Sequence, residues 1–267
     1  MNDQQYTLIT GASSGLGKEF AIQVARSGRN IILIALPGGA ARLLAASLME
    51  EFGIDAQVFE FDLTDSIELR YHIVYILKHF SINFLINNAG VGGTSAIVDT
   101  SLERIDQIIQ LNVRSMALLT HLLIPHLLTH EHSYIMNISS MAAFTPIAYK
   151  TVYPASKAFI SSFSLGLREE LAGTGLSVSV VYPGPIMTNS STTRRVISQG
   201  RKGKMGLLSA AEIASIALSR TLTQHPTIIP GFMNKVNHFL MGILPMRLKL
   251  RIVSREVKKE IQYTPTV

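Results

Sequence analysis

Tyr153 and Lys157 are the two residues of this sequence whose types and spacing most directly suggest proton-transfer chemistry. Residues four apart on a helix project from the same side, so the phenol and the ammonium would lie together. A free tyrosine has a pKa near 10, which is too high for efficient proton transfer at neutral pH, and a neighbouring ammonium would lower it. Ser140, thirteen residues before Tyr153, could hydrogen-bond a substrate oxygen and stabilise developing negative charge. Together these residues predict general acid–base catalysis at an oxygen atom.

A glycine-rich turn near the amino terminus predicts a site for a phosphate-bearing ligand. Residues 10–17 read TGASSGLG and lie between an apolar run and a helical pattern. Gly11 permits a tight turn, while Gly15 and Gly17 allow a phosphate to approach the backbone and the helix to pack on the strand. The N–H groups and positive dipole end at the start of that helix favour a pyrophosphate.

The same turn also contains the GxSxG pattern of a nucleophile elbow, with Ser13 as its serine. Such an elbow normally follows several strands and an oxyanion loop, whereas nine residues precede Thr10. A serine hydrolase that uses Ser13 is therefore a minor alternative.

The elements that would position these residues alternate along the chain. Short β-branched or apolar runs predict strands at residues 6–10, 30–36, 56–61, 83–87, 133–138, 176–182 and 227–229. Helical patterns lie between them, for example at residues 15–27, 67–79, 102–128, 155–171 and 210–222. This alternation requires crossover connections, and runs that are apolar on both faces indicate a sheet covered by helices on both sides. We predict an α/β fold of the Rossmann type, a doubly wound parallel sheet of about seven strands with helices on both faces.

The length and composition fit a single domain over residues 1–267. Hydrophobic residues make up 47% of the chain and charged residues 16%, which argues against disorder and against a fibrous protein. The chain has no cysteine, which excludes disulfides, thiolate metal ligands and a cysteine nucleophile. We find neither a secretory leader nor an apolar run of the roughly 18–20 residues that span a bilayer, and we expect a cytoplasmic protein.

Five motifs in the same order make the sequence resemble the short-chain dehydrogenase/reductase family over residues 5–230. They are TGxxxGxG at 10–17, NNAG at 87–90, Leu-Asn-Val at 111–113, Ser-x12-Tyr-x3-Lys at 140–157 and Pro-Gly…Thr at 183–188. The resemblance implies that Tyr153 is the catalytic acid/base and that Ser140 assists it, with Ser139 as the fallback. It also implies that Lys157 binds the nicotinamide ribose and that Asn112 holds a water of the proton relay.

The resemblance further implies a set of cofactor contacts in the turn, after the third and fourth strands, on the catalytic helix and at the nicotinamide clasp. These residues are Gly11, Ser13, Ser14, Gly15, Leu16, Gly17, Asp62, Leu63, Asn88, Ala89, Gly90, Tyr153, Lys157, Pro183, Gly184 and Thr188. The following helix could also be capped by Thr64.

The end of the second strand bears on the choice of nicotinamide cofactor. In this family an acid about 18 residues past the last turn glycine holds the ribose 2′-hydroxyl and excludes a 2′-phosphate. That position holds Ala35, and Leu36 follows where many NADP enzymes have arginine. Ser14 is neutral as well, and Arg42, the nearest cation, could equally be a solvated helix residue. Because the acid is absent, the prediction leans to NADP(H) over NAD(H).

Positive charge is concentrated in the last part of the chain. Residues 1–189 hold 11 Lys/Arg and 15 Asp/Glu, whereas residues 190–267 hold 13 and 3. Residues 185–206 are predicted to form a substrate lid, because a long loop in a compact domain is usually functional. Residues 231–267 form a basic, apolar C-terminal extension. We favour a role in covering apolar surface within the protein or an oligomer, and contact with a membrane surface is the alternative.

Two other kinds of site are not expected. No aromatic residues interleave with the basic clusters, so nucleic acid is not an expected partner. His126 and His130 have a spacing that could hold a metal, but no carboxylate completes a zinc motif, and we predict a surface histidine patch and no metal.

We therefore predict an NAD(P)(H)-dependent oxidoreductase that interconverts an alcohol and a carbonyl. Apolar residues of the lid and extension point to an apolar small-molecule substrate: Met187, Met205, Leu207, Phe232 and Leu240. The resemblance implies a homodimer or homotetramer. A non-catalytic dinucleotide-binding sensor or scaffold with the same fold is the main alternative.

Overall fold

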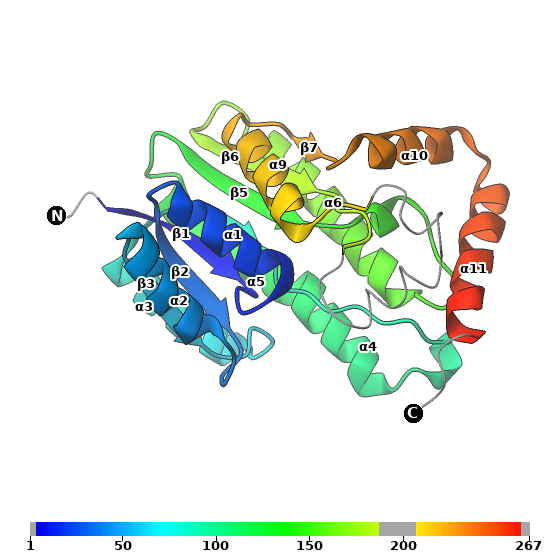
Figure 1. The fold of residues 1–267 in the computed structure, drawn as a ribbon, viewed down its shortest axis with the longest axis horizontal. Coiled ribbons are helices and arrows are strands. Elements are labelled where there is room, and N and C mark those ends of the chain that lie inside the picture. Colours follow the sequence, from blue (N-terminus) through cyan, green and yellow to red (C-terminus); the bar gives the residue numbers. More distant parts are fainter. Residues whose placement is uncertain (1–3, 187–206, 263–267) are drawn as a thin grey trace.

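A seven-stranded sheet forms the centre of the protein (Figure 1). The computed structural model describes residues 4–186 and 207–262, with side chains described as far as residue 258. The strand order is β3-β2-β1-β4-β5-β6-β7, and every neighbouring pair is parallel. The strands are β1 Gln5–Thr10, β2 Asn30–Ala35, β3 Ala56–Glu60, β4 Ser81–Asn87, β5 Ser133–Ile138, β6 Leu176–Val181 and β7 Thr227–Ile228.

Consecutive apolar residues in β2 show why this sheet is covered on both sides. Successive side chains of a strand point to opposite faces. Ile31 and Leu33 accordingly pack in one core cluster, while Ile32 and Ile34 pack in the other. A strand of this type is stable only between two layers of helices.

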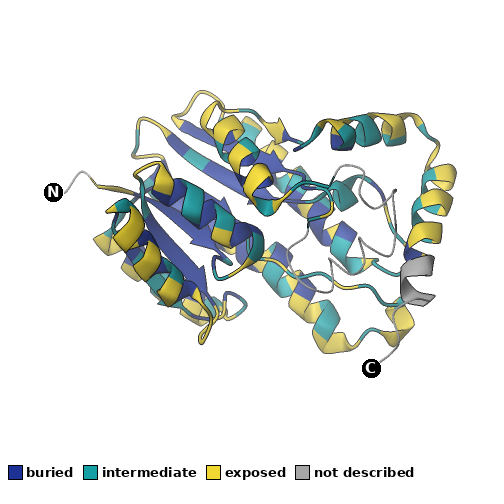
Figure 2. Cartoon of the chain, in the orientation of Figure 1, coloured by how far each residue is buried: buried dark blue, intermediate teal, exposed yellow. Residues whose placement is uncertain are grey.

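Three helices cover each face of the sheet. The first face carries α1 Gly15–Arg26, α2 Ala41–Phe52 and α9 Ala210–Leu222. The second carries α3 Ser66–His79, α5 Met116–Leu127 and α6 Val152–Glu170. Figure 2 shows the sheet as a buried layer and the outward sides of these helices as exposed.

The strand order reverses between β1 and β4, and both strands lead into predicted motifs. In doubly wound sheets a ligand binds outside the carboxyl ends of the strands at such a reversal. The predicted fold class is therefore confirmed. The predicted strand ends differ from the observed ones by at most two residues, as is usual at element ends.

The predicted long helix at residues 102–128 is not one regular α-helix. It comprises α4 Leu102–Ile109, a π segment Gln110–Ser115, and α5. The Ser115 hydroxyl lies 2.7 Å from the carbonyl oxygen of Gln110, five residues earlier, within the widened turn. Single π turns in α-helices occur frequently at functional sites.

The same helical stretch also meets the length and composition criteria for a membrane span. Leu102–Leu127 has 26 residues, and an 18-residue window within it has a mean hydropathy of 1.3. Polar residues such as Arg114 interrupt this stretch, so it contains no uninterrupted apolar run long enough to span a bilayer. In this structure Leu119, Leu123 and Leu127 pack in the core beneath the sheet.

Two further helices, α10 Phe232–Ile243 and α11 Met246–Gln262, follow the last strand. Figure 1 shows them at the end of the molecule opposite the amino terminus. Short 3-10 segments, η1 Ile97–Asp99 and η3 Met141–Phe144, lie in the loops after β4 and β5. Residues 187–206 of the predicted lid lie outside the described residues, and Ile186 forms an isolated parallel bridge with Leu208 at its border.

Candidate active site

The glycine turn between β1 and α1 leaves no room for side chains at two of its glycines. Gly11 has a φ of +66°, and a Cβ there would lie 2.9 Å from the Ala89 Cα. A Cβ on Gly17 would lie 2.1 Å from the Gly11 carbonyl oxygen. Both glycines are thus required by the close approach of α1 and the loop after β4 to this turn.

The amino terminus of α1 is suited to an anion. Ser14 is the N-cap residue, but its side chain makes no capping hydrogen bond, and the first turn contains no acidic residue. The first N–H groups of a helix have no partner inside the helix and carry a partial positive charge. The residues present therefore fit the pyrophosphate of a dinucleotide.

Thr10 joins this turn to the NNAG segment. Its Oγ1 accepts hydrogen bonds from the backbone N–H groups of Asn88 and Ala89, each at 3.0 Å. The Asn88 side chain in turn donates to the carbonyl oxygens of Thr10 and Gly11. The predicted contacts Gly11, Asn88 and Ala89 therefore belong to one hydrogen-bonded unit, in which the role of Thr10 was missed by sequence reasoning.

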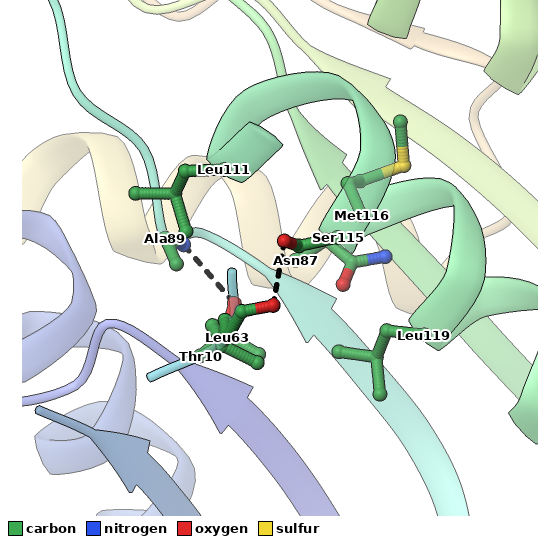
Figure 3. Close-up of a pocket in the computed structure, with 8 residues that line it drawn as sticks. All are labelled: Thr10, Leu63, Asn87, Ala89, Leu111, Ser115, Met116 and Leu119. Atoms are coloured by element: carbon green, nitrogen blue, oxygen red, sulfur yellow. Dashed lines mark hydrogen bonds between the residues drawn. The ribbon is translucent and has the colours of Figure 1, made fainter. Parts of the chain in front are cut away.

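A small, mostly apolar cavity opens beside this unit (Figure 3). Leu63 and Ala89, two predicted cofactor contacts, line it together with Leu111 and Met116. The Ser115 hydroxyl, 2.7 Å from the Leu63 carbonyl oxygen, fixes the loop after β3 against the π segment. The two predicted contact segments thus converge here, although they are far apart in sequence.

Asp62 is exposed and accepts a hydrogen bond from the Thr64 backbone N–H at 2.8 Å. The N-cap of α3 is Asp65, whose carboxylate accepts from the N–H groups of Ile67 and Glu68. The suggestion that Thr64 caps this helix was wrong, because the aspartate that follows it is the stronger acceptor. Asp62 is left available to a ligand at the carboxyl end of β3.

Helix α6 brings Tyr153 and Lys157 together. The Lys157 Nζ lies 5.8 Å from the centre of the Tyr153 ring and donates a hydrogen bond to the Ile138 carbonyl oxygen at 2.8 Å. Only 5% of Lys157 is exposed. Burial lowers the pKa of this lysine to about 8, because the charged form loses its hydration.

The loop after β4 lies against both of these residues. A Cβ on Gly90 would lie 3.3 Å from the Lys157 Nζ, and a Cβ on Gly92 would lie 3.1 Å from Cδ2 of Tyr153. The glycine of the NNAG segment therefore allows the backbone to approach α6. Gly92 is a second such position that the sequence interpretation did not single out.

Asn112 is completely buried in the π segment. Its amide donates to the Val91 carbonyl oxygen at 2.9 Å and to the Ser156 Oγ at 3.0 Å, and its Oδ1 accepts from the Val91 N–H. Ser156 donates to the Tyr153 carbonyl oxygen at 2.7 Å. Ser156, another residue missed from the sequence, thus connects Asn112 to the start of the catalytic helix.

The two serines after β5 differ in their surroundings. Ser139 is buried, and its hydroxyl donates to the Lys157 carbonyl oxygen at 2.7 Å. The half-buried Ser140 has its Oγ 3.1 Å from the Ala142 N–H, which donates to it. A hydroxyl that accepts can still donate its own hydrogen, so Ser140 rather than Ser139 can reach a substrate oxygen.

The predicted nicotinamide clasp begins beside Ser140. The Pro183 carbonyl oxygen accepts from the Met141 N–H at 3.0 Å. A Cβ on Gly184 would lie 2.7 Å from Oδ1 of Asn234, a buried residue of α10 that the sequence interpretation did not identify. Thr188, the last predicted residue of the clasp, lies outside the described residues.

At the end of β2 the neutral Ala35 pairs in register with Glu60 of β3. The Arg42 Nε lies 2.7 Å from the Glu60 Oε2 and forms an ion pair with it. The Arg42 side chain is 68% exposed and that of Glu60 is 14% exposed. A guanidinium group is therefore present near the predicted ribose site. The ion pair of Arg42 with Glu60 could not be recognised from the sequence, because 18 residues separate the two.

The other predicted sites are placed as follows. Among the described residues there is no group of three His, Cys, Asp or Glu side chains that could hold a metal. His126 is half-buried and its Nε2 accepts from the Ile82 N–H at 2.9 Å, so the predicted surface patch includes one structural histidine. Phe232 and Leu240 are exposed on α10, whereas Met187 and Met205 lie outside the described part of the chain.

The serine hydrolase alternative gains no support from this arrangement. Ser13 follows β1, and the described residues place no strand with an oxyanion loop before it. Labelling of Ser13 by a fluorophosphonate would contradict this conclusion.

Comparison with known proteins agrees with the geometry of the site. Residues 5–196 match the family model of the short chain dehydrogenases. A very-long-chain 3-oxoacyl-CoA reductase of Anas platyrhynchos is 31% identical over 190 residues, which are 70% of this chain and 61% of that protein. The chain thus spans less than two-thirds of the length of this relative.

Solved structures share both the fold and moderate sequence identity. A short-chain dehydrogenase from Sphingobium yanoikuyae in complex with NADPH has a TM-score of 0.76 and 27% identity, covering 91% of this chain and 96% of that one. A bulky-bulky ketone specific alcohol dehydrogenase from Comamonas testosteroni has a TM-score of 0.75 and 28% identity, covering 92% and 96%.

Proposed function

The chain belongs to the short-chain dehydrogenase family of oxidoreductases, and on this premise we propose that it interconverts an alcohol and a carbonyl on an apolar substrate, with Tyr153 as general acid/base. The observation that carries the proposal is the convergence at Gly90, where a Cβ would lie 3.3 Å from the Lys157 Nζ and 3.1 Å from the Asn112 Oδ1. Residues from the loop after β4, the π segment and α6 meet there. A nicotinamide cofactor, when bound, supplies or accepts the hydride.

The residues of this chain handle the proton. In the direction of reduction, the Tyr153 phenol donates its proton to the carbonyl oxygen of the substrate, and in the direction of oxidation the phenolate accepts it. The Lys157 ammonium stabilises the phenolate electrostatically. Ser140 donates a hydrogen bond to the same substrate oxygen and stabilises its negative charge.

Asn112 and Ser156 connect the loop after β4 to the first turn of α6. Both amide hydrogens of Asn112 are used inside the protein, so a water of the proton relay would bind to an oxygen of this residue. Ser156 fixes the Asn112 amide relative to the first turn of α6. We assign to these two residues the orientation of the loop that carries Gly90.

For the cofactor we propose NADP(H) in preference to NAD(H). The absence of an acid at Ala35 removes the usual barrier to a 2′-phosphate. Arg42, whose side chain is exposed, supplies a guanidinium group beside this position, where it is ion-paired with Glu60. The Sphingobium yanoikuyae structure with NADPH supports this preference.

We further propose one domain over residues 1–267, in which residues 185–206 act as the substrate lid. The protein would work in the cytoplasm as a homodimer or homotetramer, with α10 and α11 available for membrane contact. The bulky ketone named for the Comamonas testosteroni enzyme and the acyl thioester named for the Anas platyrhynchos enzyme supply two substrate classes for testing.

The proposal is tested by following NADPH oxidation with a panel of small ketones, bulky apolar ketones and 3-oxoacyl thioesters. We expect turnover of at least one apolar carbonyl. Substituting Tyr153→Phe should lower kcat/KM by about 10²–10⁴-fold, the contribution of a positioned acid/base, without loss of NADPH binding. The matched control Tyr71→Phe, on the exposed side of α3, should retain full activity.

The panel also separates the enzyme from a sensor or scaffold. NADPH binding without turnover of any substrate would favour the non-catalytic alternative. A Tyr153→Phe variant as active as the wild type would remove Tyr153 from its proposed role. Failure to bind either nicotinamide cofactor would contradict the whole assignment.

A further inference from the structure

We propose that α10 and α11 form a surface that docks on an anionic lipid bilayer. The docking surface comprises Phe232, Phe239, Ile243, Met246, Arg247, Arg251, Arg255 and Lys258. These residues are exposed and share helical faces. Their net positive charge favours an anionic bilayer as the partner.

The polarity of α10 is the reverse of that expected for a helix that packs on a protein core. Its one buried residue is Asn234, 3% exposed, which donates to the Pro230 carbonyl oxygen. Phe232, Phe239 and Ile243 are exposed by 77%, 68% and 67%. A helix of a globular protein normally buries its apolar side and exposes its polar side. Figure 2 shows the outward sides of α10 and α11 as exposed.

The exposed apolar residues lie on one side of the helix. Residues 232, 239 and 243 of α10 are separated by seven and four positions, the spacing of a single helical face, and the exposed Met246 begins α11. Contiguous exposed apolar surface of this kind marks a site of interaction with a protein or a membrane. The apolar spacing alone does not decide between these partners.

The charge of α11 identifies the partner. Residues 232–262 hold seven Lys/Arg and two Glu. Arg247, Arg251 and Arg255 are exposed and follow each other at four-residue intervals, so they share one side of the helix. None of these three arginines forms an ion pair within the described part of the chain. Amphipathic helices with an apolar side and uncompensated basic residues lie in the interface of bilayers that contain anionic lipids.

A second copy of the chain fits this surface less well. In a two-fold dimer the same patch occurs on both partners, which would bring two rows of arginines together. The repulsion between them would oppose association. The structure therefore favours a phosphate-bearing lipid surface over self-association at α10 and α11.

The position of the surface has a consequence for the substrate. Asn234 of α10 packs against Gly184 of the nicotinamide clasp, and the Ser254 hydroxyl of α11 accepts from the Ala148 N–H in the loop before α6. A docked molecule would therefore hold its active-site rim near the bilayer, where apolar carbonyl compounds dissolve. This consequence rests on the proposed function, whereas the docking itself does not.

The docking is tested by sedimentation of the full-length chain with sucrose-loaded vesicles, without substrate or cofactor. We expect vesicles of phosphatidylcholine with phosphatidylglycerol to bind at least about tenfold more protein than phosphatidylcholine alone, and salt to weaken this binding. The double variant R251E/R255E should lose about tenfold in binding to the anionic vesicles. F239Q/I243Q should lose a comparable factor through the apolar contribution.

Helix α3 supplies matched controls. It carries exposed Ile67 and Tyr71 and the exposed cations Arg70 and Lys78, so I67Q/Y71Q and R70E/K78E make the same chemical changes elsewhere. Both control variants should bind vesicles like the wild type, and NADPH binding should be unchanged in all four. If F239Q/I243Q fails to fold, vesicle binding by R251E/R255E still tests the docking proposal.

Three results would overturn the docking proposal. They are equal binding to neutral and anionic vesicles, equal loss in the α3 controls, and conversion of an oligomer to monomers by F239Q/I243Q in the absence of lipid. Failure of the carbonyl panel would leave vesicle binding intact and would count only against the proposed function.

Discussion

Lys157 is a cation in an almost completely buried position, and its burial affects both chemistry and stability. With a pKa of about 8, it is mainly charged at neutral pH, as its role beside Tyr153 requires. The buried ammonium has one described hydrogen-bond acceptor, the Ile138 carbonyl oxygen. Desolvation of this charge is therefore a stability disadvantage that the proposed catalytic role of Lys157 requires.

This disadvantage predicts an unusual pH dependence of stability. The pKa is about 8 in the folded chain against an ordinary value of 10.5, so between these values the unfolded chain binds more protons. The free energy of unfolding should therefore rise with pH, by about 2–3 kcal/mol from pH 7 to pH 10 for this group. Denaturant titrations of wild type and Lys157→Met at several pH values measure the difference. An identical pH slope in both proteins would contradict the buried-charge interpretation.

The ion pair between Arg42 and Glu60 predicts how the cofactor preference can be changed. Arg42→Ala removes the exposed cation and should weaken NADPH binding by roughly fivefold, the scale of an exposed ion pair, with little effect on NADH. Glu60→Gln leaves the arginine without its anionic partner and should strengthen NADPH binding. Fluorescence titration of both variants with NADPH and with NADH measures these changes in affinity. A parallel loss for NADH and NADPH would place Arg42 away from the 2′-phosphate.

At the scale of elements, the positions of the proposed catalytic groups depend on how closely α1, the loop after β4 and α6 approach one another. Gly11, Gly17, Gly90 and Gly92 lie where the backbone of one element meets another element. A Cβ would collide with backbone atoms at Gly11 and Gly17, whereas at Gly90 and Gly92 it would press on side chains that would have to shift slightly. The π segment between α4 and α5 completes the arrangement by placing Asn112 against the loop.

Gly17→Ala tests this close approach. A Cβ only 2.1 Å from the Gly11 carbonyl oxygen must displace α1 or the turn. We expect a loss of roughly 1–3 kcal/mol in stability, the usual scale of overpacking. NADPH affinity should fall with it, because the N-terminus of α1 moves. Thermal unfolding and cofactor titration measure the two effects.

The matched control is Gly242→Ala in α10, where a Cβ would meet nothing within 4 Å. Alanine is favoured over glycine within helices, so this change should stabilise the protein by up to about 1 kcal/mol. Equal destabilisation by both substitutions would show that the contact at Gly17 is not the cause.

At the scale of the whole molecule, exposed apolar residues also occur on α5 and α6, where we propose the contact between subunits. Leu118 of α5 is 37% exposed, and Phe159 and Leu165 of α6 are 39% and 41% exposed. Phe159 stacks on Phe163 with 5.8 Å between the ring centres. This surface lacks the arginine row of α11 and suits a second copy of the chain.

The proposed oligomer predicts the effect of charges on α6. The variant F159E/L165E should dissociate the wild-type oligomer to the 29.2 kDa chain, because carboxylates would be desolvated in the interface. Light scattering coupled to size-exclusion chromatography measures the mass. A wild-type protein that is already monomeric, or a variant of unchanged mass, would contradict the proposed interface.

The sequence by itself determined the features that depend on local backbone and periodicity. The turn at residues 10–17, the i, i+4 pair of Tyr153 and Lys157, and the strands apolar on both faces are set by residues close in sequence. These features sufficed to predict a parallel sheet and the family resemblance, and both are confirmed. The element ends were less accurate because the last turns and residues depend on neighbouring contacts.

Only the tertiary structure decided which distant residues meet. The contacts of Arg42 with Glu60, of Asn112 with Ser156, and of Asn234 with Gly184 join segments 18 to 50 residues apart, and no local pattern specifies them. The exposure of the apolar side of α10 was equally hidden, because an amphipathic sequence does not reveal which side faces the protein. The sequence period defines the faces of a helix, but tertiary packing determines which face is buried. In α10 this packing buries Asn234 and leaves Phe239 and Ile243 exposed.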